Sequence, residues 1–433
     1  MSGKLLAVLM AVLAIPVGAG IWLAAGGPGP GTPGGAGAGP GVPVASPGAL
    51  PSLDLGTLPD AGPAPRPAAC GSPSLAGANG TWLPDWLDDP SRPSLIYDQA
   101  RRLRVLDLFW LRLGAAPGSL LVQPGNPGAT SLGTALSAAA AASPCGLRFI
   151  TVNDEQVPAS VMAQILLDPV ARWRNVTALA QFTASYPQAD GLTLDYEYAL
   201  PASQADLDAY AAAGHWHGLS VREETGRITA GYTELVRELA LAMHRQHRLL
   251  RVTAMARTTD ETHYGDVTAL APFLYDYGEL AKYADQVIVM AIDFHWSTSD
   301  PGPVVTLADL KSVLSELRSY RIPAARLAVE VPAYGYDWTV DSAGHRLAGT
   351  EALTVSATDV AGHDWQQAGT KDGETSYQYT AGGRRHVVWF AGTALKYEAS
   401  QLRTLCPGCG VMAWATGNTD PAGSALITAA LGG

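Results

Sequence analysis

Eight short apolar segments, separated by stretches with other patterns, set the strongest limit on how this chain can fold. The segments are residues 81–86, 105–113, 147–152, 190–197, 250–256, 286–293, 327–332 and 410–414. Helical patterns lie between several of them, at residues 131–142, 168–186 and 228–244. Strands that alternate with helices predict a parallel sheet in an α/β fold. Eight such units predict a (β/α)8 TIM barrel, in which the chemistry lies at the C-terminal ends of the strands.

The fourth segment, Asp-Gly-Leu-Thr-Leu-Asp-Tyr-Glu at residues 190–197, carries two acids near its end. After the glycine, apolar or aromatic residues alternate with Thr193, Asp195 and Glu197. A period of two places these three side chains on one face of a strand, with Asp195 and Glu197 about 6 to 7 Å apart along the backbone. Two carboxylates this close repel each other, so one is expected to keep its proton and to serve as a general acid. The alternative is a strand end with two solvated acids.

This segment resembles the catalytic strand of family 18 glycoside hydrolases, the chitinase-like barrels, whose signature is D-x-x-D-x-D-x-E. Asp190, Asp195 and Glu197 match the signature, and Thr193 stands where many members carry an acid. Bacterial spore-cortex and cell-wall members of the YaaH type often have an uncharged residue there. The resemblance implies a TIM barrel that hydrolyses glycans containing N-acetylglucosamine.

The resemblance recurs at the end of the sixth segment. Met290-Ala-Ile-Asp293 resembles the family's M-x-Y-D signature, with Ile292 in place of a tyrosine that usually bonds the substrate acetamide. Tyr334 lies in a stretch that resembles the YaaH-type LYGYDW segment, and it is a candidate to replace the missing hydroxyl. The alternative for Asp293 is that it caps a strand-end loop.

Two further stretches near the C-terminus extend the likeness. Residues 386–390 resemble the HxVWF strand of YaaH-type members, and residues 411–417 resemble the end of their eighth strand. The family places a tryptophan there as the floor under the reactive sugar, which makes Trp414 the candidate. Sugar faces pack well on an aromatic ring. The alternative is that Trp414 is an ordinary core residue.

The resemblance also implies a mechanism. Glu197 would protonate the glycosidic oxygen, and the 2-acetamido oxygen of the substrate would attack in place of an enzyme nucleophile. Asp195 would orient the acetamide and stabilise the positive intermediate, and Asp293 would assist. No metal and no organic cofactor is needed. The expected substrate-binding residues are Asp190, Thr193, Met290, Tyr334 and Trp414.

A second hypothesis is a cell-wall-binding protein with weak or no catalysis on the same barrel. Thr193 and Ile292 motivate it, because both depart from the chitinase pattern. Lectin-like members of the family typically lose the acid itself, whereas Glu197 is present, which favours an enzyme. The polysaccharide partner is left open between chitin-like chains and peptidoglycan, with the YaaH-type matches favouring peptidoglycan.

The composition changes twice along the chain. Residues 1–25 carry Lys4 and then an apolar run, which predicts a signal peptide or an N-terminal membrane anchor. Residues 26–75 are mostly Gly, Pro, Ala and Ser, and predict a disordered linker. Residues 76–433 would form the barrel, with a loop insertion at 203–224 and an α+β insertion at 337–400 between the seventh and eighth strands. We therefore expect a protein that is secreted or anchored to the outer face of the cytoplasmic membrane.

Charge and cysteines limit the partners and the compartment. The formal net charge of -11 disfavours nucleic acid and anionic lipid, because nothing offsets the repulsion of phosphates. Contact with a membrane is expected only through the N-terminal segment. Four cysteines allow three pairings, and of these we favour Cys70 with Cys145 and Cys406 with Cys409.

Three tryptophans lie at or near the ends of predicted strands. Trp86, Trp110 and Trp296 could therefore line a sugar-binding groove. Scattered aromatic residues more often pack in a core than bind a ligand, so packing is the alternative for each of them.

Overall fold

The computed structural model describes most of the chain after residue 60. The described residues are 58, 61–89, 97, 101–122, 130–155, 157–197, 221–257, 275–363, 365–417 and 419–432. The predicted leader at 1–25, most of the predicted linker and residues 203–220 of the predicted loop insertion lie outside them. In the part of the chain that is described, no helix is both long and apolar enough to cross a membrane.

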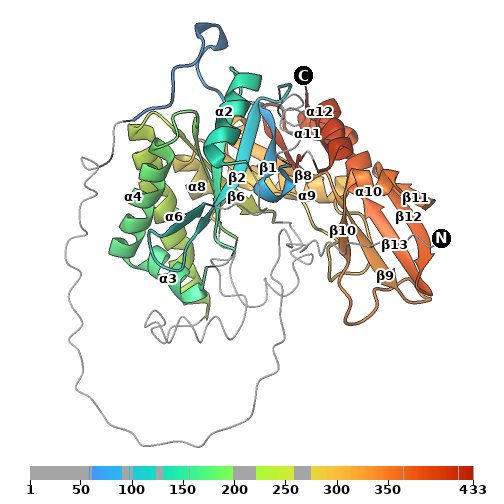
Figure 1. Ribbon diagram of the computed structural model, residues 1–433. Helices are drawn as coiled ribbons and strands as arrows, with labels where there is room; N and C mark the ends of the chain where they lie inside the picture. The colour runs from blue at the N-terminus through green and yellow to red at the C-terminus, as the bar shows by residue number, and fades with distance from the viewer. Residues whose placement is uncertain are drawn as a thin grey trace, which may run out of the picture.

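Eight parallel strands form a closed barrel, which confirms the predicted fold class (Figure 1). In chain order they are β1 (Asn79–Pro84), β2 (Val105–Leu113), β4 (Leu147–Asn153), β5 (Gly191–Asp195), β6 (Leu249–Met255), β7 (Gln286–Met290), β8 (Leu327–Pro332) and β14 (Gly410–Trp414). Each strand pairs with the next in parallel, and β1 closes the ring by pairing with both β14 and β2. A short strand, β3 (Leu120–Val122), adds an antiparallel edge to β2.

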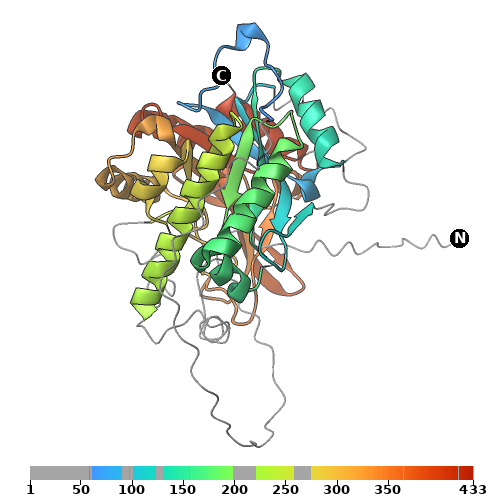
Figure 2. The same ribbon diagram turned by 90° about the vertical axis from the view of Figure 1, so that its left-hand side faces the viewer.

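Helices surround the barrel and cover its outer face (Figures 1 and 2). They are α2 (Leu132–Ala142), α3 (Ala159–Leu167), α4 (Pro169–Ala184), α6 (Val221–Arg245), α8 (Tyr277–Tyr283), α9 (Leu307–Ser319), α11 (Leu395–Leu405) and α12 (Pro421–Leu431). Side-chain caps fix where several of them begin. Ser131 accepts from the backbone N–H of Thr134, and Thr306 forms a reciprocal capping box with Asp309. The predicted helices at 131–142, 168–186 and 228–244 correspond to α2, α4 and α6.

Two apolar layers follow from the alternation of residues along the strands. One layer packs the outward faces of the strands against the helices, and Leu192, Leu194 and Tyr196 of the fourth segment belong to it. The other layer fills the interior of the barrel, where Phe149, Ile288 and Met412 meet. The odd-numbered polar residues of β5 therefore point into the barrel, as the period of two predicts.

An α+β insertion lies between β8 and β14, as predicted. It is a five-stranded antiparallel sheet of β9 (Gly335–Val340), β10 (Leu353–Val355), β11 (Gln366–Lys371), β12 (Glu374–Ala381) and β13 (Arg384–Phe390), with the short helix α10 (Ala357–Ala361). The order in the sheet is β10-β9-β13-β12-β11, and it stands beside one side of the barrel in Figure 1. Gly335 is needed where β9 enters the sheet, because a Cβ there would lie 2.1 Å from the Trp389 carbonyl oxygen.

The N-terminal part of the described chain packs across the N-terminal end of the barrel. The Cys70–Cys145 and Cys406–Cys409 disulfides are both present, which confirms the favoured pairing. Leu75 is buried, and its carbonyl oxygen accepts from the Gln286 side chain at 3.2 Å. The predicted end of the disordered linker at residue 75 is therefore wrong, because residues 61–75 are tied to the barrel by covalent and polar contacts.

Candidate active site

Asp195 and Glu197 lie at the C-terminal end of β5 and face the mouth of the barrel. Asp195 is 5% exposed, and its Oδ1 accepts from the Thr253 hydroxyl on β6 at 2.6 Å. The backbone N–H of Glu197 donates to Asp154 Oδ1 at 2.9 Å, which fixes the chain just after β5. Tyr196 between them points the other way, where its hydroxyl accepts from Asn175 on α4 at 3.2 Å. The two acids therefore share one side of the strand end.

Burial raises the pKa of both acids, and the charge of Asp195 adds to the rise at Glu197. Burial, followed by the charge of Asp195, raises the pKa of Glu197 well above its usual range. Burial raises the pKa of Asp195 to about 7, while the Thr253 hydrogen bond opposes that rise. Glu197 Oε2 is buried and has no hydrogen-bond partner among the described residues. Burial thus favours the neutral form of Glu197 and moves the ionisation of Asp195 towards neutral pH.

Asp293 joins the site from the end of β7. Its Oδ1 accepts from the hydroxyl of Tyr336 at 3.0 Å and from that of Tyr334 at 2.5 Å. Burial raises the pKa of Asp293 to about 7, and the two tyrosine hydrogen bonds oppose that rise. The side chain thus meets tyrosine hydroxyls rather than loop N–H groups, which does not fit a strand-end cap. Its Oδ2 is buried without a partner in the part of the chain that is described.

The two tyrosines come from the beginning of the insertion. Tyr334 has a single hydroxyl proton, and in this structure that proton is donated to Asp293. Tyr334 is thus not free to donate a hydrogen bond to an acetamide in place of the tyrosine missing at position 292. Its role in the site is to orient Asp293.

Thr193 lies one layer deeper, inside the barrel below Asp195. It is fully buried and donates to Asp107 on β2, which also forms an ion pair with Arg251 on β6. Arg251 is further bonded to Gln286 Oε1 at 3.0 Å. A side chain with no exposed surface does not contact a substrate, so the predicted substrate-binding role of Thr193 is not supported. Thr193 instead links β5 to the polar layer under the site.

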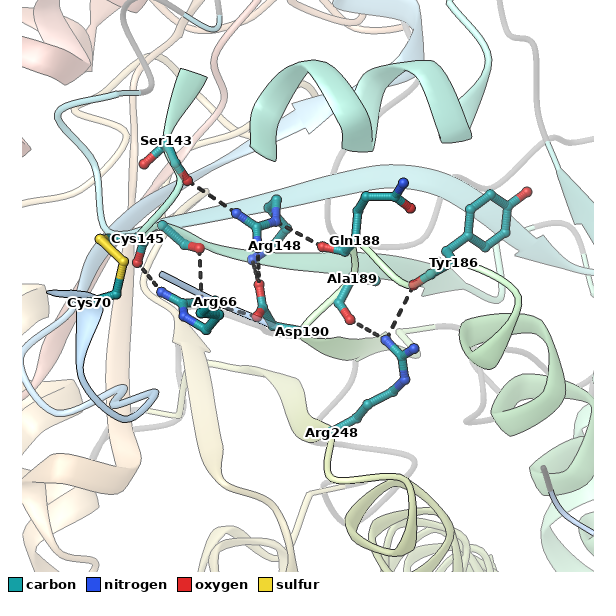
Figure 3. A network of polar contacts seen from close by, with 11 residues as sticks. Arg66, Cys70, Ser143, Cys145, Arg148, Tyr186, Gln188, Ala189, Asp190 and Arg248 are labelled. Atoms are coloured by element: carbon teal, nitrogen blue, oxygen red, sulfur yellow. Dashed lines mark hydrogen bonds and ion pairs between the residues drawn. A yellow bond between two sulfur atoms is a disulfide. The ribbon is translucent and has the colours of Figure 1, made fainter. Parts of the chain in front are cut away.

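Asp190 lies at the opposite end of β5, and its predicted role in substrate binding is wrong. Its carboxylate forms ion pairs with Arg66 at 3.0 Å and with Arg148 at 3.1 Å, and it accepts the Arg148 backbone N–H at 2.9 Å (Figure 3). Arg66 also bonds the carbonyl oxygens of Gly146 and Cys145, beside the Cys70–Cys145 disulfide. Asp190 therefore holds the N-terminal segment on the far end of the barrel.

Trp414 ends β14 at the same rim as Asp195. It is partly exposed, so it is not an ordinary core tryptophan. Its ring packs against Phe109 at 5.4 Å, Trp82 at 6.0 Å and Trp86 at 6.3 Å between centroids. Met290 ends β7 and is almost fully buried, with 6% of its surface exposed. Trp414 and Met290 therefore lie at the same rim as Asp195, with Trp414 partly exposed and Met290 buried.

The three other tryptophans that sequence reasoning singled out separate into two groups. Trp86 and Trp296 are partly exposed, and Trp296 packs in the same cluster as Trp414. Trp110 is 1% exposed and donates to the Thr130 carbonyl oxygen on the helix side of the barrel. The prediction that Trp110 could line a groove is wrong, because its side chain points outward from the barrel.

Several polar residues of the site were missed from the sequence. Tyr336 lies in the stretch that resembles the LYGYDW segment, but nothing in the sequence pairs it with Asp293, and Thr253 carries no signal. Each becomes the partner of a carboxyl at the rim only when the strands close into a barrel. Glu330 did carry a signal, since it is a charged residue inside an otherwise apolar strand. It is 1% exposed and accepts from Trp82 Nε1 at 2.8 Å.

No group of three or more His, Cys, Asp or Glu side chains in the described ranges is arranged to hold a metal ion. The acids at the rim are instead paired with hydroxyl groups and backbone N–H groups. The arrangement thus offers a proton donor, an ionisable carboxyl and an aromatic platform at one end of a barrel.

Part of the chain is similar in sequence to known proteins. The chain is 28% identical over 192 residues to the uncharacterized glycosylase YvbX and 28% identical over 165 residues to the cortical fragment-lytic enzyme, both of Bacillus subtilis. These alignments cover 44% and 37% of this chain, and only 53% and 36% of the relatives.

Solved structures share the fold. The chitinase of Chromobacterium violaceum superposes with a TM-score of 0.61 at 18% identity, covering 81% of this chain and 99% of that one. The Bacillus cereus spore cortex-lytic enzyme SleL gives a TM-score of 0.61 at 15% identity, covering 82% and 74%. The model of the glycosyl hydrolases family 18 matches residues 163–418, more than half of the chain and including β5 through β14. The chain therefore belongs to glycosyl hydrolase family 18.

Proposed function

We propose that this chain is a glycosidase that cleaves β-1,4 bonds next to N-acetylglucosamine by substrate-assisted, retaining catalysis. The observation that carries the proposal is the pair at the end of β5, where Asp195 and Glu197 share one side of the strand end. Burial there favours the neutral form of Glu197 and raises the pKa of Asp195 to about 7. A proton donor and an anion on one face of one strand suit a mechanism in which the substrate supplies the nucleophile.

The geometry disfavours a nucleophile from the protein. A retaining glycosidase with its own nucleophile places two carboxyl groups on opposite sides of the scissile bond. Asp195 and Glu197 instead share one side of the same strand end. Asp195 therefore approaches the sugar from the side of the acid, where it can reach the 2-acetamido group.

The first step breaks the bond between the anomeric carbon and the glycosidic oxygen. The acetamide oxygen attacks the anomeric carbon, and Glu197 gives its proton to the leaving oxygen. Asp195, as a carboxylate, accepts the acetamide N–H and stabilises the positive charge of the oxazolinium ring. Asp293 assists from the end of β7, where the hydroxyls of Tyr334 and Tyr336 hold its carboxyl group in place.

The second step restores the acid. Glu197, now ionised, takes a proton from water while the water oxygen attacks the anomeric carbon. The bond between that carbon and the acetamide oxygen breaks, so the oxazolinium ring opens and the acetamide is restored. The configuration at that carbon is the same as in the substrate, because it has been inverted twice. Trp414 would support the apolar face of the reactive sugar throughout.

Peptidoglycan is the substrate that we propose. The relatives include a protein named cortical fragment-lytic enzyme and a spore cortex-lytic enzyme, and chitinases share the fold as well. Both polymers carry the N-acetyl group that the mechanism needs. A net charge of -11 and the apolar segment at residues 1–25 suit a protein that is exported to a cell wall.

The proposal is tested by mass spectrometry of products from peptidoglycan strands and from N-acetylglucosamine oligomers. Wild type is expected to release fragments with N-acetylglucosamine at the new reducing end. Glu197→Gln removes the general acid, so hydrolysis is expected to slow by about 10² to 10⁴-fold. Glu316→Gln on α9, away from the rim, is the matched control and should keep wild-type activity. Equal activity in Glu197→Gln would end the proposal, and binding without any product from wild type would favour the wall-binding hypothesis.

A further inference from the structure

Glu330 is a buried carboxyl inside the barrel to which the proposed mechanism gives no role. It lies on β8 in register with Met290 on β7 and Met412 on β14, and it is 1% exposed. A buried acid in an apolar strand costs free energy unless it is bonded. Its position beside the catalytic acids suggests that it serves the reaction.

Glu330 bonds to the aromatic floor of the site. Its Oε2 accepts from Trp82 Nε1 on β1 at 2.8 Å, and Trp82 is itself 1% exposed. The Trp82 ring packs against Trp414 with centroids 6.0 Å apart. The strands β1 and β8 are the two neighbours of β14, so the Glu330–Trp82 hydrogen bond joins the strands on either side of the one that ends at Trp414.

The charges around Glu330 favour its neutral form. Burial, followed by the charge of Asp195, raises the pKa of Glu330 well above its usual range. Burial lowers the pKa of Arg251 and the charge of Glu330 opposes that fall, so these two groups attract each other. The Arg251 guanidinium is already paired with Asp107, however, and among the described residues it forms no ion pair with Glu330. The charged or ionisable groups that act on Glu330, or on which it acts, are Asp107 on β2, Asp195 and Glu197 at β5, Arg251 on β6, Asp293 after β7 and Tyr334 after β8.

We propose that Glu330 is a positioning residue, whose hydrogen bond with the indole N–H holds Trp82 and through it the Trp414 floor. Its carbonyl oxygen satisfies the indole N–H, which would otherwise be buried without a partner. Because it carries no charge, it fixes the floor without opposing the ionisation of Asp195. This inference rests on the proposed function, since it names a residue that shapes the reactive-sugar site.

The test compares Glu330→Gln with Glu330→Leu, each in wild type and in the Glu197→Gln background. The amide oxygen of glutamine can accept from Trp82 without a charge, so Glu330→Gln is expected to keep kcat, KM and oligomer affinity within about threefold. Leucine leaves the indole N–H unpaired, so Glu330→Leu is expected to raise KM more than it lowers kcat and to weaken binding by about 10 to 100-fold. Glu398→Gln on α11, a buried acid away from the rim, is the control for changes at a buried carboxyl.

Calorimetry with N-acetylglucosamine oligomers in the Glu197→Gln background separates this inference from the proposed function, because binding does not require hydrolysis. Infrared difference spectra between wild type and Glu330→Gln need no sugar, and at neutral pH they should show a protonated carboxyl band that is present only in the chain with Glu330. The inference is overturned if that band is absent, if Glu330→Gln loses as much affinity as Glu330→Leu, or if Glu330→Leu binds like its parent. If Glu330→Leu does not fold, the infrared band and the oligomer affinity of Glu330→Gln still test the inference, since loss of affinity in Glu330→Gln would overturn it.

Discussion

Replacement of Asp190 by alanine separates its structural role from a role in substrate binding. Three interactions are lost: two ion pairs, with Arg66 at 3.0 Å and Arg148 at 3.1 Å, and the bond from the Arg148 backbone N–H at 2.9 Å. The Asp190 side chain is only 4% exposed, so water does not replace it as a partner. Removing one member of a buried ion pair costs about 3 to 5 kcal/mol. That is a large part of the roughly 5 to 15 kcal/mol by which a domain is stable.

The assay is urea unfolding followed by tryptophan fluorescence, together with kcat and KM measured on the folded fraction. We expect unchanged kinetics, because Asp190 and Glu197 are separated by about 20 Å of extended strand. Asp168→Ala is a matched control, since it removes a helix cap of α4 and should cost only about 1 kcal/mol. The structural role would be refuted if Asp190→Ala lowered the free energy of unfolding by no more than Asp168→Ala does. A raised KM in fully folded Asp190→Ala protein would refute it as well.

Two further predictions concern the ionisation of the site. Thr253→Val removes the hydrogen bond that opposes the rise in the pKa of Asp195, so the acidic limb of the kcat/KM profile should move to higher pH; an unchanged limb would show that Asp195 need not ionise. Folding raises the pKa of Asp293 from 3.8 to about 7, so this group's contribution to stability should be lost as pH rises across that interval, by up to about 4 kcal/mol. Asp293→Asn should flatten the decline in unfolding free energy, and a variant with the same pH dependence as wild type would contradict the burial argument.

The strand that carries Asp195 could be predicted because its signal is local. A period of two in residues 191–197 fixes which side chains enter the barrel, and the structure places Asp195 and Thr193 there. The same period of two places Asp190 in phase with Leu192, which faces outward. Asp190 also lies directly before β5, at the end of the strand opposite Asp195. The period therefore indicates that Asp190 does not share the site of Asp195. The family signature contains both Asp190 and Glu197, although the two side chains lie at opposite ends of the barrel in the structure.

The partners of these residues could not be predicted, because they meet only when distant strands close into a ring. Glu330 is 135 positions from Asp195 in the chain, and Tyr334 is 41 from Asp293. Arg66 lies in a stretch whose composition resembles a linker, yet it binds Asp190 across 124 positions. Composition describes the average behaviour of a segment, whereas one arginine and one disulfide are enough to fix residues 66–70 on the barrel.

The most direct test of the mechanism compares an N-acetylglucosamine oligomer with the same oligomer lacking the acetyl group on the reactive sugar. In the substrate-assisted mechanism the acetamide oxygen is the nucleophile, so wild type is expected to cleave the acetylated chain and to leave the bond at the deacetylated sugar intact. Cleavage of both bonds at similar rates would rule out this mechanism, because the nucleophile would then be a group other than the acetamide oxygen.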